Sequence, residues 1–261
     1  MLLLRAILKL IRLSSSLLGA LAVFVGLMAR TKRLGISVAY AVPLLFIGMC
    51  TFIANDLEDL EKDQFIHPER PLPSKDITPE LAAILYFMSL GLALILTRHF
   101  VAQDIAFWYY GLAIMSISYV YVIDGLPSLK TIYVAAASCV PILIVARSYP
   151  SEVKLYVVAG SVFLLSLGRE ICGDIQDRKG DTPCFIHRFK PSSLAIIAFC
   201  FNGLALVLLA LIVRNIREIT DVLVMSLMLA VAGLYWFKLR LYKRATMVMK
   251  VQLFVGLYLL L

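Results

Sequence analysis

The sequence predicts an all-α integral membrane protein with about nine membrane-spanning helices around a central cavity. Hydrophobic residues fill 61% of the 261 positions, well above the roughly 45–50% of soluble domains. Several apolar runs reach the ~20 residues that a helix needs to cross a bilayer. The Lys and Arg residues behind the net charge of +8 lie between these runs, so the charge indicates membrane topology and no nucleic-acid partner.

Nine apolar runs divide the chain, and each predicts one membrane helix of a single domain over residues 1–261. An amphipathic N-terminal stretch precedes the first run. There Arg5, Lys9 and Arg12 recur among leucines, a pattern typical of a helix at the membrane interface. The last run is short for a crossing. The predicted spans are residues 13–29, 36–54, 80–97, 105–122, 131–147, 153–171, 194–213, 222–238 and 248–261.

The loops between the spans carry the topology signal. If the N-terminus is cytoplasmic, most of the 25 Lys and Arg residues fall on the cytoplasmic side, as the positive-inside rule requires. The two longest loops, 55–79 and 172–193, also face that side, and loops often carry function. We therefore expect the functional site to open to the cytoplasm. The cytoplasmic loops would be 55–79, 123–130, 172–193 and 239–247.

The first long loop begins with the acidic run "IANDLEDLEKD" at residues 53–63. Its carboxylates, Asp56, Asp59 and Asp63, have the spacing i, i+3, i+7. On a helix, side chains with this spacing fall within about 60° of one another. The run therefore predicts an extension of the preceding membrane helix with a stripe of three carboxylates on one face, ended by the prolines of residues 68–73.

The second long loop repeats this pattern. A shift of 118 residues places the first triad on a second one with the same spacing. Repeated halves that meet at a shared central site are common in membrane proteins, so we infer a duplication with two similar loops around one cavity. The shift aligns Asp56 with Asp174, Asp59 with Asp177, Asp63 with Asp181, Arg70 with Arg188, and Pro73 with Pro191.

Six carboxylates that face one cavity cannot all ionise without cations nearby. Mg²⁺ is a suitable partner, because it binds one or two carboxylates together with phosphate oxygens of a substrate. Basic side chains beside the triads are suited to hold phosphate oxygens. These basic residues are Arg70, Arg169, Arg178, Lys179, Arg188 and Lys190, with Lys130 at the foot of the next pair of helices.

The two motifs resemble those of the UbiA superfamily of intramembrane prenyltransferases. "NDLEDLEKD" has the form NDxxDxxxD, and "DIQDRKGD" has the form DxxDxxxD. The stretches "LKLIRLSSSLLGALAVFVG" and "REICGDIQDRKGD" are similar to the digeranylgeranylglyceryl phosphate synthase branch of that superfamily. The resemblance implies the nine-helix fold of the family and an Mg²⁺-dependent reaction of an isoprenoid diphosphate.

The resemblance also implies roles for individual residues. Asn55 and the first triad would bind Mg²⁺ and diphosphate, and the second triad would do so from the opposite side. Tyr121 and Lys130 resemble a Tyr-then-Lys element between the fourth and fifth helices of the family, with Lys130 on the diphosphate. The metal ligands implied are Asp56, Asp59, Asp63, Asp174, Asp177 and Asp181.

The sequence leaves three functions open. The first is transfer of a polyprenyl group from an allylic diphosphate to a lipophilic acceptor, either a lipid or an aromatic compound. The second is a terpene cyclase on the same fold. The third is a transporter or divalent-cation channel, which needs ionisable residues near mid-span. The predicted spans contain almost none away from their ends, which disfavours the third function.

Overall fold

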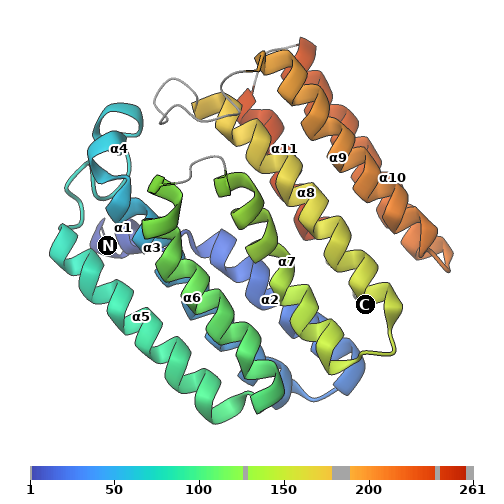
Figure 1. Cartoon of the computed structure of the whole chain (residues 1–261), viewed down its shortest axis with the longest axis horizontal. Coiled ribbons are helices and arrows are strands. Elements are labelled where there is room, and N and C mark those ends of the chain that lie inside the picture. The colour runs from blue at the N-terminus through green and yellow to red at the C-terminus, as the bar shows by residue number, and fades with distance from the viewer. Residues whose placement is uncertain (1, 126–128, 178–188, 239–241, 257–261) are drawn as a thin grey trace. The chain divides into compact units, whose positions relative to one another are not determined.

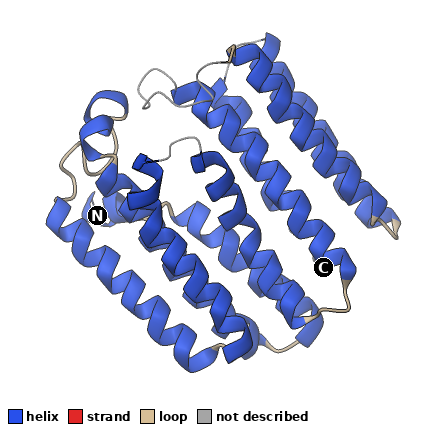
Figure 2. Cartoon of the chain, in the orientation of Figure 1, coloured by secondary structure: helices blue, strands red, loops and turns tan. Residues whose placement is uncertain are grey.

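The computed structural model describes residues 2–125, 129–177, 189–238 and 242–256. All the regular elements in these ranges are helices (Figure 2). Seven are long and apolar enough to cross a membrane, so the protein is an all-α integral membrane protein, as predicted. The seven are α2 (Leu13–Thr31), α3 (Leu34–Glu58), α5 (Pro79–Phe100), α7 (Lys130–Ser148), residues Val153–Ile175 of α8 (Val153–Asp177), α9 (Pro191–Leu211), and Arg217–Phe237.

The last of these stretches combines α10 (Ile216–Gly233) with a π-helical turn, η3 (Leu234–Lys238). Two further long helices are α6 (Gln103–Gly125) and α11 (Tyr242–Gly256). They overlap the two remaining apolar runs that the sequence predicted as membrane spans, residues 105–122 and 248–261. Neither is among the seven candidate spans in the described residues. The prediction of nine membrane spans is therefore not confirmed.

The chain forms two compact units, residues Met1–Leu126 and Pro127–Leu261. In the first unit, α3 packs against α2, α5 and α6 (Figure 1). In the second unit, α8 packs against α7, α9 and α11, and α10 lies along α9 and α11. Each unit is thus built around its second long helix, and the acidic motif of that unit begins near the end of this helix.

The order of helices inside the units follows the predicted repeat. A shift of 118 residues carries the start of α2 and the start of α3 to within one residue of the starts of α7 and α8. The units also differ, because α6 packs on the motif helix of the first unit whereas α11 does so in the second. The single domain predicted from the sequence stays a prediction.

The amphipathic N-terminal stretch forms α1 (Leu2–Leu10). Its exposed face carries Leu3, Leu4 and Leu8. Its buried face packs on the end of α3, on the loop after α4 (Leu60–Ile66) and on the start of α5. This small core contains Ala6, Leu10, Ile11, Ile53, Leu72, Ile77 and Ala82. It lies directly beside the first acidic motif.

Candidate active site

The first motif lies where α3 passes into α4. Helix α3 ends at Glu58 and α4 begins at Leu60, so the predicted extension is divided at Asp59. Its hydrogen bonds nevertheless continue with helical spacing, from the Asp59 N–H to the Asn55 carbonyl at 2.9 Å and from the Asp63 N–H to the Asp59 carbonyl at 2.7 Å. The three aspartates therefore keep roughly the helical spacing that the sequence predicted.

Two carboxylates of this triad are buried and share one arginine. Asp56 is 3% exposed and Asp63 is 2% exposed. Arg70 forms an ion pair through Nη1 with Asp63 Oδ2, and the same nitrogen lies 3.9 Å from Asp56 Oδ1. Burial of a charge is costly unless a partner of opposite sign accompanies it. The sequence predicted these three residues as site residues, and the structure brings them together.

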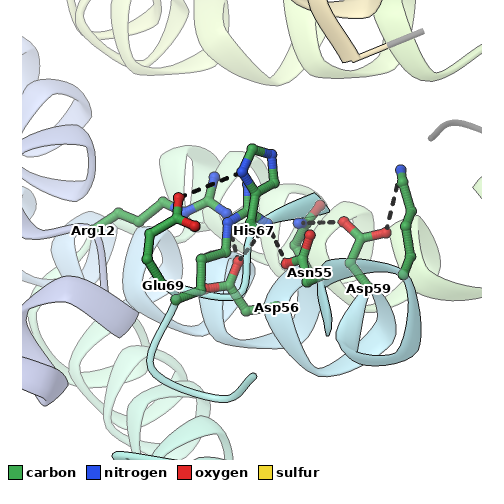
Figure 3. A network of polar contacts seen from close by, with 9 residues as sticks. Arg12, Asn55, Asp56, Asp59, His67 and Glu69 are labelled. Carbon is green, nitrogen blue, oxygen red and sulfur yellow. Dashed lines mark hydrogen bonds and ion pairs between the residues drawn. The ribbon is translucent and has the colours of Figure 1, made fainter. Parts of the chain in front are cut away.

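Arg12 completes this cluster, and the sequence had assigned it only to the amphipathic N-terminus. Its Nη2 lies 2.5 Å from Asp56 Oδ1, and its guanidinium lies 5.2 Å from the ring centre of Phe52. Figure 3 shows the Arg12 side chain reaching Asp56 from outside the motif. No local signal marks Arg12, because it lies 44 residues from its partner in the chain.

Further polar contacts are made by residues of the motif and of the segment that follows it (Figure 3). Asn55 donates a hydrogen bond from Nδ2 to Asp59 Oδ2 at 3.0 Å, and Lys62 Nζ lies 4.0 Å from Asp59 Oδ1. His67 Nδ1 lies 3.6 Å from a carboxylate oxygen of Glu69. Asp59 is half-buried, so it is more open to solvent than the other two aspartates.

The loop after α4 positions Arg70. Its backbone folds on itself, with the Arg70 N–H bonded to the His67 carbonyl at 3.0 Å and the Ile77 N–H bonded to the Pro71 carbonyl at 3.1 Å. Leu72 and Ile77 are 3% and 1% exposed and anchor the loop in the core beside α1. Two buried apolar residues that follow Arg70 in the chain therefore hold the loop that brings its guanidinium near the carboxylates.

The second motif is described as far as the end of α8. Asp174 is buried, and the Thr131 hydroxyl donates a hydrogen bond to its Oδ2 at 2.7 Å. Thr131 follows Lys130, the first residue of α7. The structure thus places the start of α7, where Lys130 was predicted to act, beside the first aspartate of this motif. Arg169 forms an ion pair with its neighbour Glu170.

Several predicted site residues are beyond what can be placed. Tyr121 lies in α6 and Asp177 ends α8, but their side chains are outside the described part of the chain. Arg178, Lys179, Asp181 and Arg188 lie outside the described residues altogether. Their roles stay predictions.

The donor set of the first motif suits Mg²⁺. No group of three or more His, Cys, Asp or Glu side chains in the described ranges is arranged to hold a metal ion. Mg²⁺ does not require one, since it commonly takes one or two carboxylates and completes its shell with water and phosphate oxygens. The ion pairs use Oδ1 of Asp56 and Oδ2 of Asp63, and each carboxylate has a second oxygen. The residues present therefore fit this metal.

A comparison with known protein families shows which family this chain belongs to. The sequence matches the UbiA prenyltransferase family over residues 13–260. This chain belongs to the UbiA prenyltransferase family. The match includes both acidic motifs, so the resemblance predicted from their spacing is confirmed.

Two curated relatives of this chain are both named digeranylgeranylglyceryl phosphate synthase. The chain is 34% identical to a digeranylgeranylglyceryl phosphate synthase of Thermococcus gammatolerans over 129 residues, which cover 49% of the chain and 46% of the relative. It is 28% identical to a digeranylgeranylglyceryl phosphate synthase of Hyperthermus butylicus over 198 residues, 68% of the chain and 64% of the relative. The chain thus spans about half to two thirds of the length of these relatives.

Solved structures of UbiA proteins have the same fold. A structure of digeranylgeranylglyceryl phosphate synthase superposes with a TM-score of 0.73 at 18% identity, covering 100% of this chain and 98% of that one. A UbiA homologue from Archaeoglobus fulgidus, bound to DMAPP and Mg²⁺, gives a TM-score of 0.69 at 16% identity, covering 97% and 98%. At this identity the likeness concerns the fold alone.

Proposed function

We propose that this protein is a prenyltransferase that moves an isoprenoid chain from an allylic diphosphate to a hydroxyl group of a glycerophosphate lipid. The observation that carries the proposal is the cluster in which buried Asp56 and Asp63 share Arg70 within an NDxxDxxxD motif. Membership of the UbiA family supports the reaction type. A cluster of carboxylates with guanidinium groups beside apolar spans suits a substrate with an anionic head and a long apolar tail.

The names of the two curated relatives support the acceptor. The product in both names, digeranylgeranylglyceryl phosphate, carries two geranylgeranyl chains on glyceryl phosphate. We therefore propose geranylgeranyl diphosphate as the donor and geranylgeranylglyceryl phosphate as the acceptor. Both molecules are amphiphiles that partition into the membrane in which this chain is embedded.

The proposed reaction exchanges one C–O bond for another. The bond between C1 of the allylic chain and the diphosphate oxygen breaks, and both electrons leave with the oxygen. A lone pair on the acceptor hydroxyl oxygen then attacks the allylic cation and forms an ether, and the hydroxyl proton passes to the released diphosphate. Water must be excluded in between because it would compete for the cation.

The protein side chains bind and orient the diphosphate in this proposal. Preorganised positive charge beside a departing anion is usually the largest catalytic contribution, and Arg70 is already held by its loop against the first motif. We assign phosphate contacts also to Lys130, Arg169, Arg178, Lys179 and Arg188, and a supporting role to Tyr121. Mg²⁺ held by the Asp triads 56, 59, 63 and 174, 177, 181 would neutralise charge on the leaving diphosphate.

We further propose that both motifs serve a single diphosphate and that the site opens to the cytoplasm. The repeat supports the first part, because each unit carries the same motif at the end of its second long helix. The distribution of Lys and Arg residues between the loops supports the second part.

Turnover by the purified protein in lipid nanodiscs tests the proposal. Geranylgeranyl diphosphate, Mg²⁺ and geranylgeranylglyceryl phosphate should together give the doubly prenylated ether lipid, detected by mass spectrometry, with release of one pyrophosphate. Omission of the acceptor or of Mg²⁺ should stop pyrophosphate release. A cyclic hydrocarbon or alcohol formed without acceptor would identify a terpene cyclase instead, and no reaction with any isoprenoid diphosphate would refute the proposal.

A further inference from the structure

Helix α1 is connected to the first acidic motif through Arg12, a residue that lies outside the motif. Arg12 is the second of the two residues between α1 and α2, and its backbone has φ 42° and ψ 54°. This left-handed conformation is uncommon for a residue other than glycine. Non-glycine residues in this region persist where the surrounding structure fixes them, often at functional sites.

Backbone contacts on both sides fix the Arg12 conformation. The Arg12 N–H bonds to the Lys9 carbonyl at 3.1 Å, which closes α1. The Arg12 carbonyl accepts hydrogen bonds from the N–H groups of Ser15 and Ser16, at 2.7 Å and 3.1 Å, which opens α2. The Ser16 hydroxyl also donates to the Ile11 carbonyl at 2.7 Å. These hydrogen bonds hold the junction in a conformation from which the Arg12 side chain reaches Asp56.

Packing of α1 fixes the junction from the other side. Leu10 is 0% exposed and, with Ala6 and Ile11, packs in the small core that also contains Ile53 of α3. Ile53 lies three residues before Asp56 on the same helix. The position of α1 and the position of the motif carboxylate are thus coupled through both an apolar contact and an ion pair.

The second unit has a related contact one residue away from the equivalent position. The shift of 118 residues carries Arg12 to Lys130, and Asp56 to Asp174. In that unit Thr131, the residue after Lys130, donates its hydroxyl to Asp174. In both units a side chain at or just before the start of the first long helix therefore contacts the first aspartate of the motif, through an ion pair in the first unit and a hydrogen bond in the second.

We propose that α1 and Arg12 form a positioning element that holds the Asp56 carboxylate in place for the Mg²⁺–diphosphate complex. The inference rests on the proposed function. Partners that orient metal ligands commonly affect metal affinity or activity by about 10- to 100-fold. Arg12 also contributes a positive charge toward a complex that is anionic overall. Removal of Arg12 therefore weakens binding of the complex in two ways, through loss of the Asp56 position and through loss of this charge.

Binding of Mg²⁺ with inorganic pyrophosphate, measured by titration calorimetry on the full chain in nanodiscs, tests the inference. Arg12→Gln should weaken binding about 10- to 100-fold, and Arg12→Lys should restore part of the loss. Leu10→Ala keeps the Arg12 charge but loosens the packing of α1, and it should also weaken binding. Leu8→Ala, on the exposed face of the same helix, is the matched control and should bind like the wild type.

Thermal unfolding of the same variants without ligand separates positioning from simple support of the fold. Wild-type affinity in both Arg12→Gln and Leu10→Ala would overturn the inference, whether or not their unfolding temperatures fall. An equal loss in Leu8→Ala would also overturn it, because the effect would then come from membrane attachment. If Arg12→Gln does not fold, Leu10→Ala and Arg12→Lys decide. Failure of the wild type itself to bind Mg²⁺–pyrophosphate would instead count against the proposed function.

Discussion

Asp56 and Asp63 are carboxylates that the fold removes from water almost completely, and guanidinium groups accompany them. Arg12 and Arg70 both approach Asp56 Oδ1, and Arg70 also pairs with Asp63. Removal of one partner from a buried ion pair typically costs ~3–5 kcal/mol, because the other charge is left without compensation. Variants of a single member of the cluster should therefore preserve its shape where possible, so that a loss of activity can be separated from a loss of stability.

Asparagine replacements test the two buried carboxylates with little change in volume. Asp56→Asn and Asp63→Asn should each lower turnover at least about 100-fold, a rise of ~3 kcal/mol in the barrier, because a metal ligand and its charge are lost. Asp76→Asn, at an exposed position in the following loop, is the control and should keep wild-type turnover. Near-normal turnover in Asp56→Asn, with the fold verified by its melting curve, would remove this residue from the site.

Thr131 provides a test in the second unit. Thr131→Val removes the hydroxyl that donates to buried Asp174 at 2.7 Å while keeping the β-branched shape. Loss of a partner to a buried polar group costs ~1–3 kcal/mol, so the unfolding temperature and the turnover should both fall. Thr131→Ser keeps the donor and should behave like the wild type. If the valine and serine variants have the same unfolding temperature and the same turnover, the hydrogen bond contributes to neither stability nor function.

The sequence predicted the residues of the first cluster in part. Spacing alone identified Asp56, Asp59 and Asp63, because a helical period places them on one face. Arg12 was missed, since the helical spacing of Arg5, Lys9 and Arg12 among leucines is equally well explained by a helix at the membrane interface. Only the tertiary contact between α1 and α3 shows that Arg12 differs from the other two.

At the scale of helices, long apolar runs predicted the positions of the helices well, but they did not predict an interruption within a helix. The apolar runs located α2, α3, α5, α7, α8 and α9 within several residues, because a span must satisfy its backbone hydrogen bonds internally. The division of the extension at Asp59 was not predicted. No proline or glycine lies there, and the helical hydrogen-bond spacing continues across it.

Packing between α8 and α9 depends on a single glycine. A Cβ atom at Gly168 would lie 1.9 Å from Asn202 Nδ2 and 2.6 Å from the Ala198 carbonyl oxygen. Gly168→Ala should therefore lower the unfolding temperature, with a loss of ~1–3 kcal/mol for an overpacked contact. On the same helix, a Cβ at Gly160 meets nothing within 4 Å, so Gly160→Ala should be neutral or slightly stabilising. The opposite order of melting temperatures would show that the two helices pack differently.

At the scale of the whole molecule, the repeat is the feature that the sequence predicted best. Both units have the same helix order at their start, and both carry a motif helix in the centre. Duplication explains why the same aspartate spacing occurs twice, whereas two unrelated surface loops would not share it. The acceptor could not be predicted in this way, because recognition of the acceptor depends on side chains outside the two motifs.

The shared use of one diphosphate by both motifs is the central claim. Titration calorimetry with Mg²⁺ and inorganic pyrophosphate measures it directly, through the number of sites per chain and their response to Asp56→Asn and Asp174→Asn. We predict one site per chain, lost or weakened at least about 100-fold by either substitution, since each removes a charged ligand worth ~3 kcal/mol. Two independent sites, or one site that Asp174→Asn leaves at wild-type affinity, would contradict the claim.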